Sequence, residues 1–154
     1  SGENGYALAK EWMPKIQPSL TAAQIVKAQC NLGQMYLRGE GVEKDDKEAV
    51  KWYRKAALQG HANAQFNLGV MYRKGQGVEQ DFMEATKWFR KAAEQGNAIA
   101  QANLGYMYAA GVGVEKDSVE AYKWYSLAIT NGYTKAKSIR DKLSKNSCSS
   151  YHSI

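Results

Sequence analysis

The sequence predicts an all-α protein, an α-solenoid built from helix–turn–helix repeats, on two observations. A 36-residue unit occurs three times in succession, over residues 28–63, 64–99 and 100–135, and 18 of its 36 positions hold one residue type in all three copies. Each copy contains two segments with apolar residues at helical spacing, separated by a glycine-rich turn. Because one such unit cannot bury its apolar face alone, the units are expected to stack into one continuous core in a single domain spanning 1–154.

The N-terminal flank, residues 1–27, is predicted to cap the array. A helix is expected over 4–17, followed by a second helix that enters the first repeat and covers about 22–38. Thr21 and Gln24 have the spacing of a capping box at the start of that second helix. The flank would then shield the apolar face of the first repeat from water.

The C-terminal flank is predicted to contain a second cap. Residues 136–145 continue the register of the repeats and are expected to form a helix with one face on the third repeat. Residues 146–154 form a tail without helical periodicity. Self-association of the chain through this tail, or through an uncapped end of the array, is one possible interaction.

The first helix of each repeat has an apolar face and a glycine in its middle. In the second copy the face holds Ala64, Leu68, Met71 and Tyr72, which share one side of a helix. A glycine inside a helix costs about 1 kcal/mol relative to alanine, so its recurrence requires a cause. We expect a neighbouring helix to pack there too closely for a Cβ atom. The three positions are Gly33, Gly69 and Gly105.

The second helix of each repeat is predicted to begin at an aspartate, with a glutamate three residues later. This spacing allows the two side chains to cap the helix reciprocally. The buried face alternates small and aromatic residues, which lets two helices interlock. The capping pairs are Asp45 with Glu48, Asp81 with Glu84, and Asp117 with Glu120. In the second copy the buried face holds Ala85, Trp88, Phe89 and Ala92.

No cluster of ionisable side chains predicts catalysis, and we expect neither enzymatic activity nor a cofactor or metal. His61 falls at a turn between repeats and is predicted to be an exposed turn residue. The glycine-rich turns lack the preceding strand and the Gly-Lys-Ser/Thr ending of a phosphate-binding loop. No apolar run approaches the ~20 residues of a membrane span. The sequence leaves the compartment open.

Three motifs that recur in every copy, A-Q-x-N-L-G-x-M-Y, G-x-G-V-E-x-D and E-A-x-K-W-[YF], resemble the Sel1-like repeat, a relative of the tetratricopeptide repeat. The resemblance implies a right-handed, tetratricopeptide-like superhelix that acts as a non-enzymatic adaptor or scaffold for other proteins. Some cysteine-rich secreted members carry a disulfide in every repeat. This chain has only Cys30 and Cys148, which we expect to be free thiols, so the penicillin-binding or β-lactamase activity suggested for that branch does not carry over.

The same resemblance implies that the first helix of each repeat lines a concave groove. The groove is expected to be basic and polar in the first two repeats and apolar near Tyr106, which suits a peptide or protein segment with acidic residues and an apolar anchor. A net charge of +6 agrees with such a partner. Cys30 and Ala102 are also expected to face the groove. The candidate binding residues are Asn31, Gln34, Arg38, Phe66, Asn67, Val70, Arg73, Lys74, Asn103 and Tyr106.

Asparagine is the one candidate that recurs in all three copies, at Asn31, Asn67 and Asn103. Two interpretations remain open. The amide could grip the backbone of a ligand while the variable neighbours set specificity, or it could bond the adjacent helix.

The second helices carry a basic stripe that offers an alternative function, binding of nucleic acid or of an anionic surface. The stripe lacks exposed aromatic residues between its charges and is balanced by acidic residues in the turns, so a solvated face is favoured. Its members are Lys51, Arg54, Lys55, Lys87, Arg90, Lys91 and Lys123.

Overall fold

The computed structural model describes residues 20–149. Within that range the chain forms seven α-helices and one 3₁₀ turn, with no strand, which confirms the all-α solenoid. The helix expected over 4–17 and the last residues of the tail, 150–154, lie outside the described residues. The capping role of 1–19 therefore stays a prediction.

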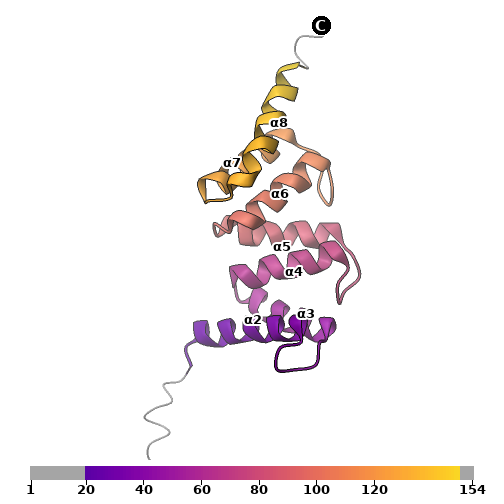
Figure 1. Ribbon diagram of the computed structural model, residues 1–154, viewed down its shortest axis with the longest axis vertical. Coiled ribbons are helices and arrows are strands. Elements are labelled where there is room, and N and C mark those ends of the chain that lie inside the picture. The colour runs from indigo at the N-terminus through magenta and orange to yellow at the C-terminus, as the bar shows by residue number, and fades with distance from the viewer. Residues whose placement is uncertain (1–19, 150–154) are drawn as a thin grey trace, which may run out of the picture.

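The helices pair into three hairpins that stack along the long axis of the molecule, with the last helix at the far end (Figure 1). Each hairpin packs against the next through the second helix of one repeat and the first helix of the following one. The hairpins are α2 (Ala22–Arg38) with α3 (Asp46–Leu58), α4 (Ala62–Lys74) with α5 (Phe82–Glu94), and α6 (Ala98–Ala110) with α7 (Ser118–Thr130). The 3₁₀ turn η1 (Thr134–Ala136) and α8 (Lys137–Ser149) follow.

The start of the array agrees with the prediction because its signals are local. Thr21 and Gln24 form both hydrogen bonds of the capping box, at 3.3 and 2.9 Å. Gly39 ends the helix in the left-handed conformation, at φ 69°, where its N–H donates to the Met35 carbonyl.

The glycine in the middle of each first helix lies against an aromatic ring, as predicted. A Cβ on Gly69 would lie 2.8 Å from Cδ1 of Phe89, and one on Gly33 would lie 2.8 Å from Cδ1 of Tyr53. Such distances are too short for two carbon atoms, so only glycine lets the two helices of a hairpin approach this closely. Phe89 and Tyr53 are fully buried as a result.

The reciprocal cap predicted for the second helices forms only in part. The Asp81 carboxylate accepts from the N–H groups of Met83 and Glu84, both at 3.0 Å, and Asp45 and Asp117 do the same in their repeats. The Asp81 N–H, however, donates to the Tyr72 carbonyl at 2.9 Å rather than to glutamate. The glutamate side chain instead faces a lysine one turn along, as Glu84 does Lys87 at 3.8 Å. The carbonyls of the preceding helix thus supply the acceptor that a glutamate was expected to supply.

His61 is not the exposed turn residue that the sequence suggested. It is half-buried and caps α4, with Nδ1 accepting from the Ala64 N–H at 3.2 Å. Asn97 caps α6 in the same way, at 2.9 Å to Ala100. The third copy has Tyr133 at this position, which provides no side-chain cap, and the chain there enters a 3₁₀ turn instead.

The C-terminal helix differs from the predicted 136–145. It begins at Lys137 after the 3₁₀ turn and continues to Ser149, so part of the expected tail is helical. The reason is the absence of glycine: Gly75 and Gly111 end α4 and α6, whereas Ser147 stands at the equivalent position of α8.

In the second and third repeats, a buried glutamine at the second position contacts both neighbouring second helices or their C-caps. The Gln65 side chain, 4% exposed, donates to the Ala57 carbonyl of α3 at 3.1 Å and accepts from Gln95, the C-cap of α5, at 2.8 Å. Gln101 repeats the arrangement with the Ala93 carbonyl and with Asn131, the C-cap of α7, both at 3.0 Å. Each glutamine therefore joins its own repeat to the preceding one, a role that the sequence did not reveal.

We expect Gly69→Ala to destabilise the protein, although alanine is normally the better helix former by about 1 kcal/mol. The added Cβ would meet both the buried Phe89 ring and, at 3.3 Å, the Ala85 carbonyl, and overpacking of this kind costs about 1–3 kcal/mol. Gly105→Ala is the matched comparison, because its Cβ would lie 3.1 Å from Tyr125 and should cost less. Urea unfolding measures both; equal or increased stability of Gly69→Ala would contradict the close-contact explanation.

We expect the His61→Asn variant to lose less folding stability than the wild type when the pH is lowered. Burial lowers the pKa of His61, and the nearby Lys27 lowers it further, so the unfolded chain binds a proton more readily than the folded one. The contribution of neutral His61 to the free energy of unfolding is therefore complete above the pKa that histidine has in the unfolded chain, about 6.5. It declines as the pH falls below that value. Protonation also removes the acceptor that caps α4.

The Asn side chain should keep the cap, as Asn97 does, without titrating. The check is the free energy of unfolding of both proteins at pH 7.5 and 5.5; His152 is common to both and cancels. The same acid-induced loss in both would show that His61 is not responsible.

Candidate peptide-binding groove

The candidate groove residues all belong to the first helices α2, α4 and α6, and none of them is buried. Asn31, Arg38, Lys74 and Tyr106 are exposed, and the other candidates are half-buried. Phe66 also packs on the core, with its ring centroid 5.8 Å from that of Phe89.

Cys30 and Ala102, which the sequence placed on the groove surface, are buried at 8% and 7% exposure. Burial raises the pKa of the Cys30 thiol, so this thiol stays protonated and poorly nucleophilic.

A hollow of about 270 Å³ lies at the third repeat, where the sequence predicted an apolar anchor point. It combines side chains of α4, α6 and α7 with the turn and helix that follow, so it exists only because the repeats are stacked. Its lining residues are Arg73, Ala102, Asn103, Tyr106, Tyr125, Tyr133 and Ile139.

Sequence reasoning missed three of these residues, Tyr125, Tyr133 and Ile139. A signal for one of them was present: Ala136 is in register with Ala100, so Ile139 takes the position of Asn103 one unit later. Tyr125 lies in the floor, 3% exposed, and burial raises its pKa to about 12. Its ring therefore contributes a neutral, apolar surface.

Among the described residues, Arg73 is the only charged one that lines this hollow. Its guanidinium donates to Oδ1 of Asn103 at 2.6 Å and lies 5.9 Å from the Phe89 ring centroid. Among the described residues, no carboxylate forms an ion pair with it. The charge is thus held in place by neutral groups, and part of its hydrogen-bonding capacity is unused.

The asparagines do not behave alike. Asn103 bonds neighbouring groups, because Oδ1 accepts from Arg73 and Nδ2 donates to the Ile99 carbonyl at 2.8 Å. Within the part of the chain that the structure describes, the side chains of Asn31 and Asn67 show no hydrogen bond. The interpretation in which the asparagine bonds a neighbouring helix thus applies to the third repeat. The amides of Asn31 and Asn67 remain available to a ligand.

The basic stripe of the second helices is largely engaged in contacts within the protein. Arg54 and Arg90 donate to the hydroxyls of Tyr72 and Tyr108 in the following repeat and lie 5.8 and 5.5 Å from those ring centroids. The Lys91 ammonium lies 5.0 Å from the Trp88 ring centroid, as Lys55 does at 4.5 Å from Trp52. The arginine contacts join successive repeats, and the lysine contacts lie within one helix. Both engage the stripe within the protein and argue against a dedicated nucleic-acid surface.

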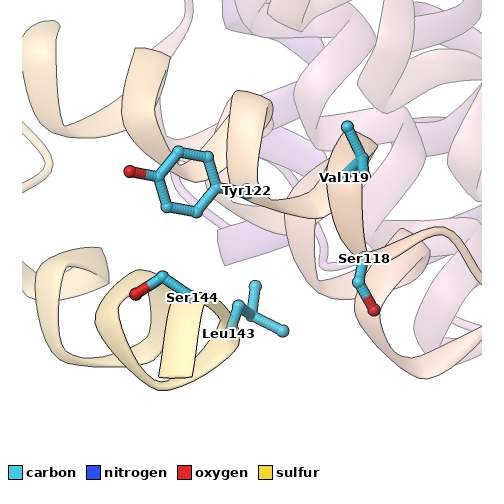
Figure 2. A pocket seen from close by; sticks show the side chains of 5 residues that line it. All are labelled: Ser118, Val119, Tyr122, Leu143 and Ser144. Carbon is cyan, nitrogen blue, oxygen red and sulfur yellow. The ribbon is translucent and has the colours of Figure 1, made fainter. Parts of the chain in front are cut away.

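A second hollow, of about 250 Å³, lies between α7 and α8. Figure 2 shows Leu143 pointing from α8 into the space bounded by Ser118 and Tyr122 of α7. Val119 and Ser144 complete the lining, which is mainly apolar.

Over residues 20–149, no group of three or more His, Cys, Asp and Glu side chains is arranged to hold a metal ion. None of the helices described is both long enough and apolar enough to cross a bilayer.

A family model of the Sel1 repeat matches the chain three times, over 26–61, 62–97 and 98–133. The chain belongs to the Sel1 repeat family. The matched units have the predicted 36-residue length and begin two residues earlier than the predicted register. Sel1 repeat arrays are typically non-catalytic scaffolds for interaction with other proteins.

Solved structures of Sel1 repeat proteins are similar to this chain. A Sel1 repeat protein from Oxalobacter formigenes is 43% identical with a TM-score of 0.72, over 76% of this chain and 88% of that one. The uropathogenic Escherichia coli protective antigen c5321, which has an SLR fold, is 49% identical with a TM-score of 0.71, over 72% of this chain and 24% of that one.

A more distant similarity is to the cysteine-rich protein B of Helicobacter pylori, at 26% identity and a TM-score of 0.64, over 77% of this chain and 91% of that one. No curated protein matches the chain significantly.

Proposed function

We propose that this Sel1 repeat array binds a segment of a partner protein along its first helices and anchors one apolar side chain of that segment in the hollow at Tyr106. The hollow is the single observation that carries the proposal. It lies on the face where the candidate residues cluster, and it is open to solvent beside Tyr106, which is 52% exposed.

The lining favours an apolar side chain with a carboxylate close by. Tyr106, Tyr125, Tyr133 and Ile139 provide apolar surface, and Arg73 provides one positive charge without an acidic partner among the described residues. An acidic residue next to the anchor would gain a charge-assisted hydrogen bond from the unused N–H groups of this guanidinium.

One anchor does not give tight binding by itself. Burying a single Leu or Phe side chain contributes about 1.5–3 kcal/mol, which is less than a micromolar affinity requires. The remaining affinity would come from backbone contacts along the groove, where the amides of Asn31 and Asn67 are available. Arg38 and Lys74 would add long-range attraction and speed the encounter.

We expect Tyr106→Ala to weaken binding of a selected peptide by about tenfold or more, because it removes one wall of the anchor site. A phage-displayed peptide library provides the probe, and isothermal titration calorimetry of the selected peptide measures the affinity.

Arg73→Gln should weaken binding and reduce its dependence on salt. Tyr122→Ala, a change at another exposed tyrosine outside the groove, is the control and should bind like the wild type.

The combined replacement of Asn67, Arg73, Lys74 and Tyr106 by Ala should abolish binding while the far-UV circular dichroism stays helical. Undiminished affinity of a folded quadruple variant would disprove the groove as the binding site.

A further inference from the structure

The hollow at Tyr106 borders a position whose side chain changes in size between repeats. This position holds Phe66 in the second repeat and Ala102 in the third. The Phe66 ring packs on the core, with its centroid 5.8 Å from that of Phe89 and the two ring planes tilted by 44°. Ala102, which lines the hollow, provides no ring. The third repeat therefore lacks the aromatic side chain that packs on Phe89 in the second.

The supporting ring of the second helix is placed in the same way in both repeats. Phe89 and Tyr125 hold equivalent positions, and each lies against the glycine in the middle of its first helix. A Cβ on Gly69 would lie 2.8 Å from Phe89, and one on Gly105 would lie 3.1 Å from Tyr125. Because this close contact fixes the ring, Tyr125 offers an incoming ring the support that Phe89 offers within the second repeat.

The hollow is large enough for a six-membered ring. Its volume is about 270 Å³, whereas a cavity of about 150 Å³ with apolar walls is sufficient to bind benzene. Tyr106 and Tyr133 also line it, so a ring placed there would meet aromatic surface besides that of Tyr125. Aromatic pairs prefer tilted or offset contacts, the arrangement that Phe66 and Phe89 already show. Both the size and the lining of the hollow favour an aromatic occupant.

We propose that the hollow binds an aromatic side chain of the partner segment, packed on Tyr125 in the place that corresponds to the Phe66 ring of the second repeat. This inference rests on the proposed groove function and narrows it, from an apolar anchor to a phenylalanine or another aromatic residue. Ala102 is then the residue that determines this specificity, because a larger side chain at its position would occupy the space that the ligand ring needs.

Arg73 adds a preference for an acidic residue beside the aromatic one. Its guanidinium lines the hollow and donates to Asn103 at 2.6 Å, and no carboxylate among the described residues pairs with it. A carboxylate one or two positions from the aromatic residue would accept from its unused N–H groups, and such charge-assisted hydrogen bonds are stronger than neutral ones. The partner motif is thus an aromatic residue close to Asp or Glu.

Peptides selected on the full chain from a phage-displayed random library should share this motif. Isothermal titration calorimetry of one synthetic peptide and its analogues measures the preference for a ring. Replacement of the aromatic residue by Leu should weaken binding about two- to tenfold, which is the effect of an aromatic pair beyond the burial of apolar area. Replacement by Ala should weaken it further, because the hollow is then left unfilled.

Ala102→Phe supplies the missing ring from the chain itself. The melting temperature of this variant should equal or exceed that of the wild type, because the new ring would pack on Tyr125 as Phe66 packs on Phe89. The variant should bind the aromatic peptide about tenfold or more weakly and should no longer distinguish it from its Leu analogue, a coupling that a double-mutant cycle measures. Ala110→Phe is the control: it makes the same exchange at an exposed position of α6 outside the hollow and should keep the preference.

Failure of this inference is distinguishable from failure of the groove function. A lower melting temperature of Ala102→Phe would show that the space does not accept a ring and would overturn the inference without any peptide. Peptides that bind the wild type but not the folded quadruple Ala variant would support the groove; if they lack an aromatic preference, or keep it in Ala102→Phe, the inference is wrong. If no peptide can be selected, or the quadruple variant binds undiminished, the groove function and this inference are overturned together.

Discussion

The buried glutamine at the second position of the second and third repeats is the contact on which the stacking of the three repeats depends. Gln65 and Gln101 each bond a carbonyl of the preceding repeat and a side chain at the end of their own second helix. Leaving one such buried amide unpaired would cost about 1–3 kcal/mol, so the repeats must keep the spacing that satisfies it. That spacing brings α4 and α6 close enough for Arg73 to reach Asn103.

Several features set within one helix or one turn could be predicted from the sequence, whereas contacts between residues farther apart in the chain could not. The capping box at Thr21, the end of α2 at Gly39 and the close contact at Gly69 follow from local spacing and from the cost of glycine in a helix. The donation from the Asp81 N–H to the Tyr72 carbonyl depends on how a turn folds back on its helix. The capping role of His61 is local, to the Ala64 N–H three residues later, and was missed because histidine is not among the residue types preferred at helix N-caps.

The candidate site shows the same division. The helical register predicted which side chains of the first helices face the candidate groove, Tyr106 and Asn67 among them. It could not predict that a hollow lies on that face. The hollow needs Tyr133 and Ile139, whose positions depend on a 3₁₀ turn and on a helix that lacks the terminating glycine. The sequence therefore indicated the surface, and the structure supplies the cavity on it.

The interface between the third repeat and α8 is built differently from the two interfaces between repeats. Hydrogen bonds from Arg54 to Tyr72 and from Arg90 to Tyr108 join each repeat to the next. At the third interface both members are replaced together, by Ser126 and Ser144, and the Ser126 hydroxyl is buried without a hydrogen-bond partner among the described residues. Helix α8 thus covers the core of the third repeat without the arginine–tyrosine hydrogen bond and without the glycine turn of a further repeat.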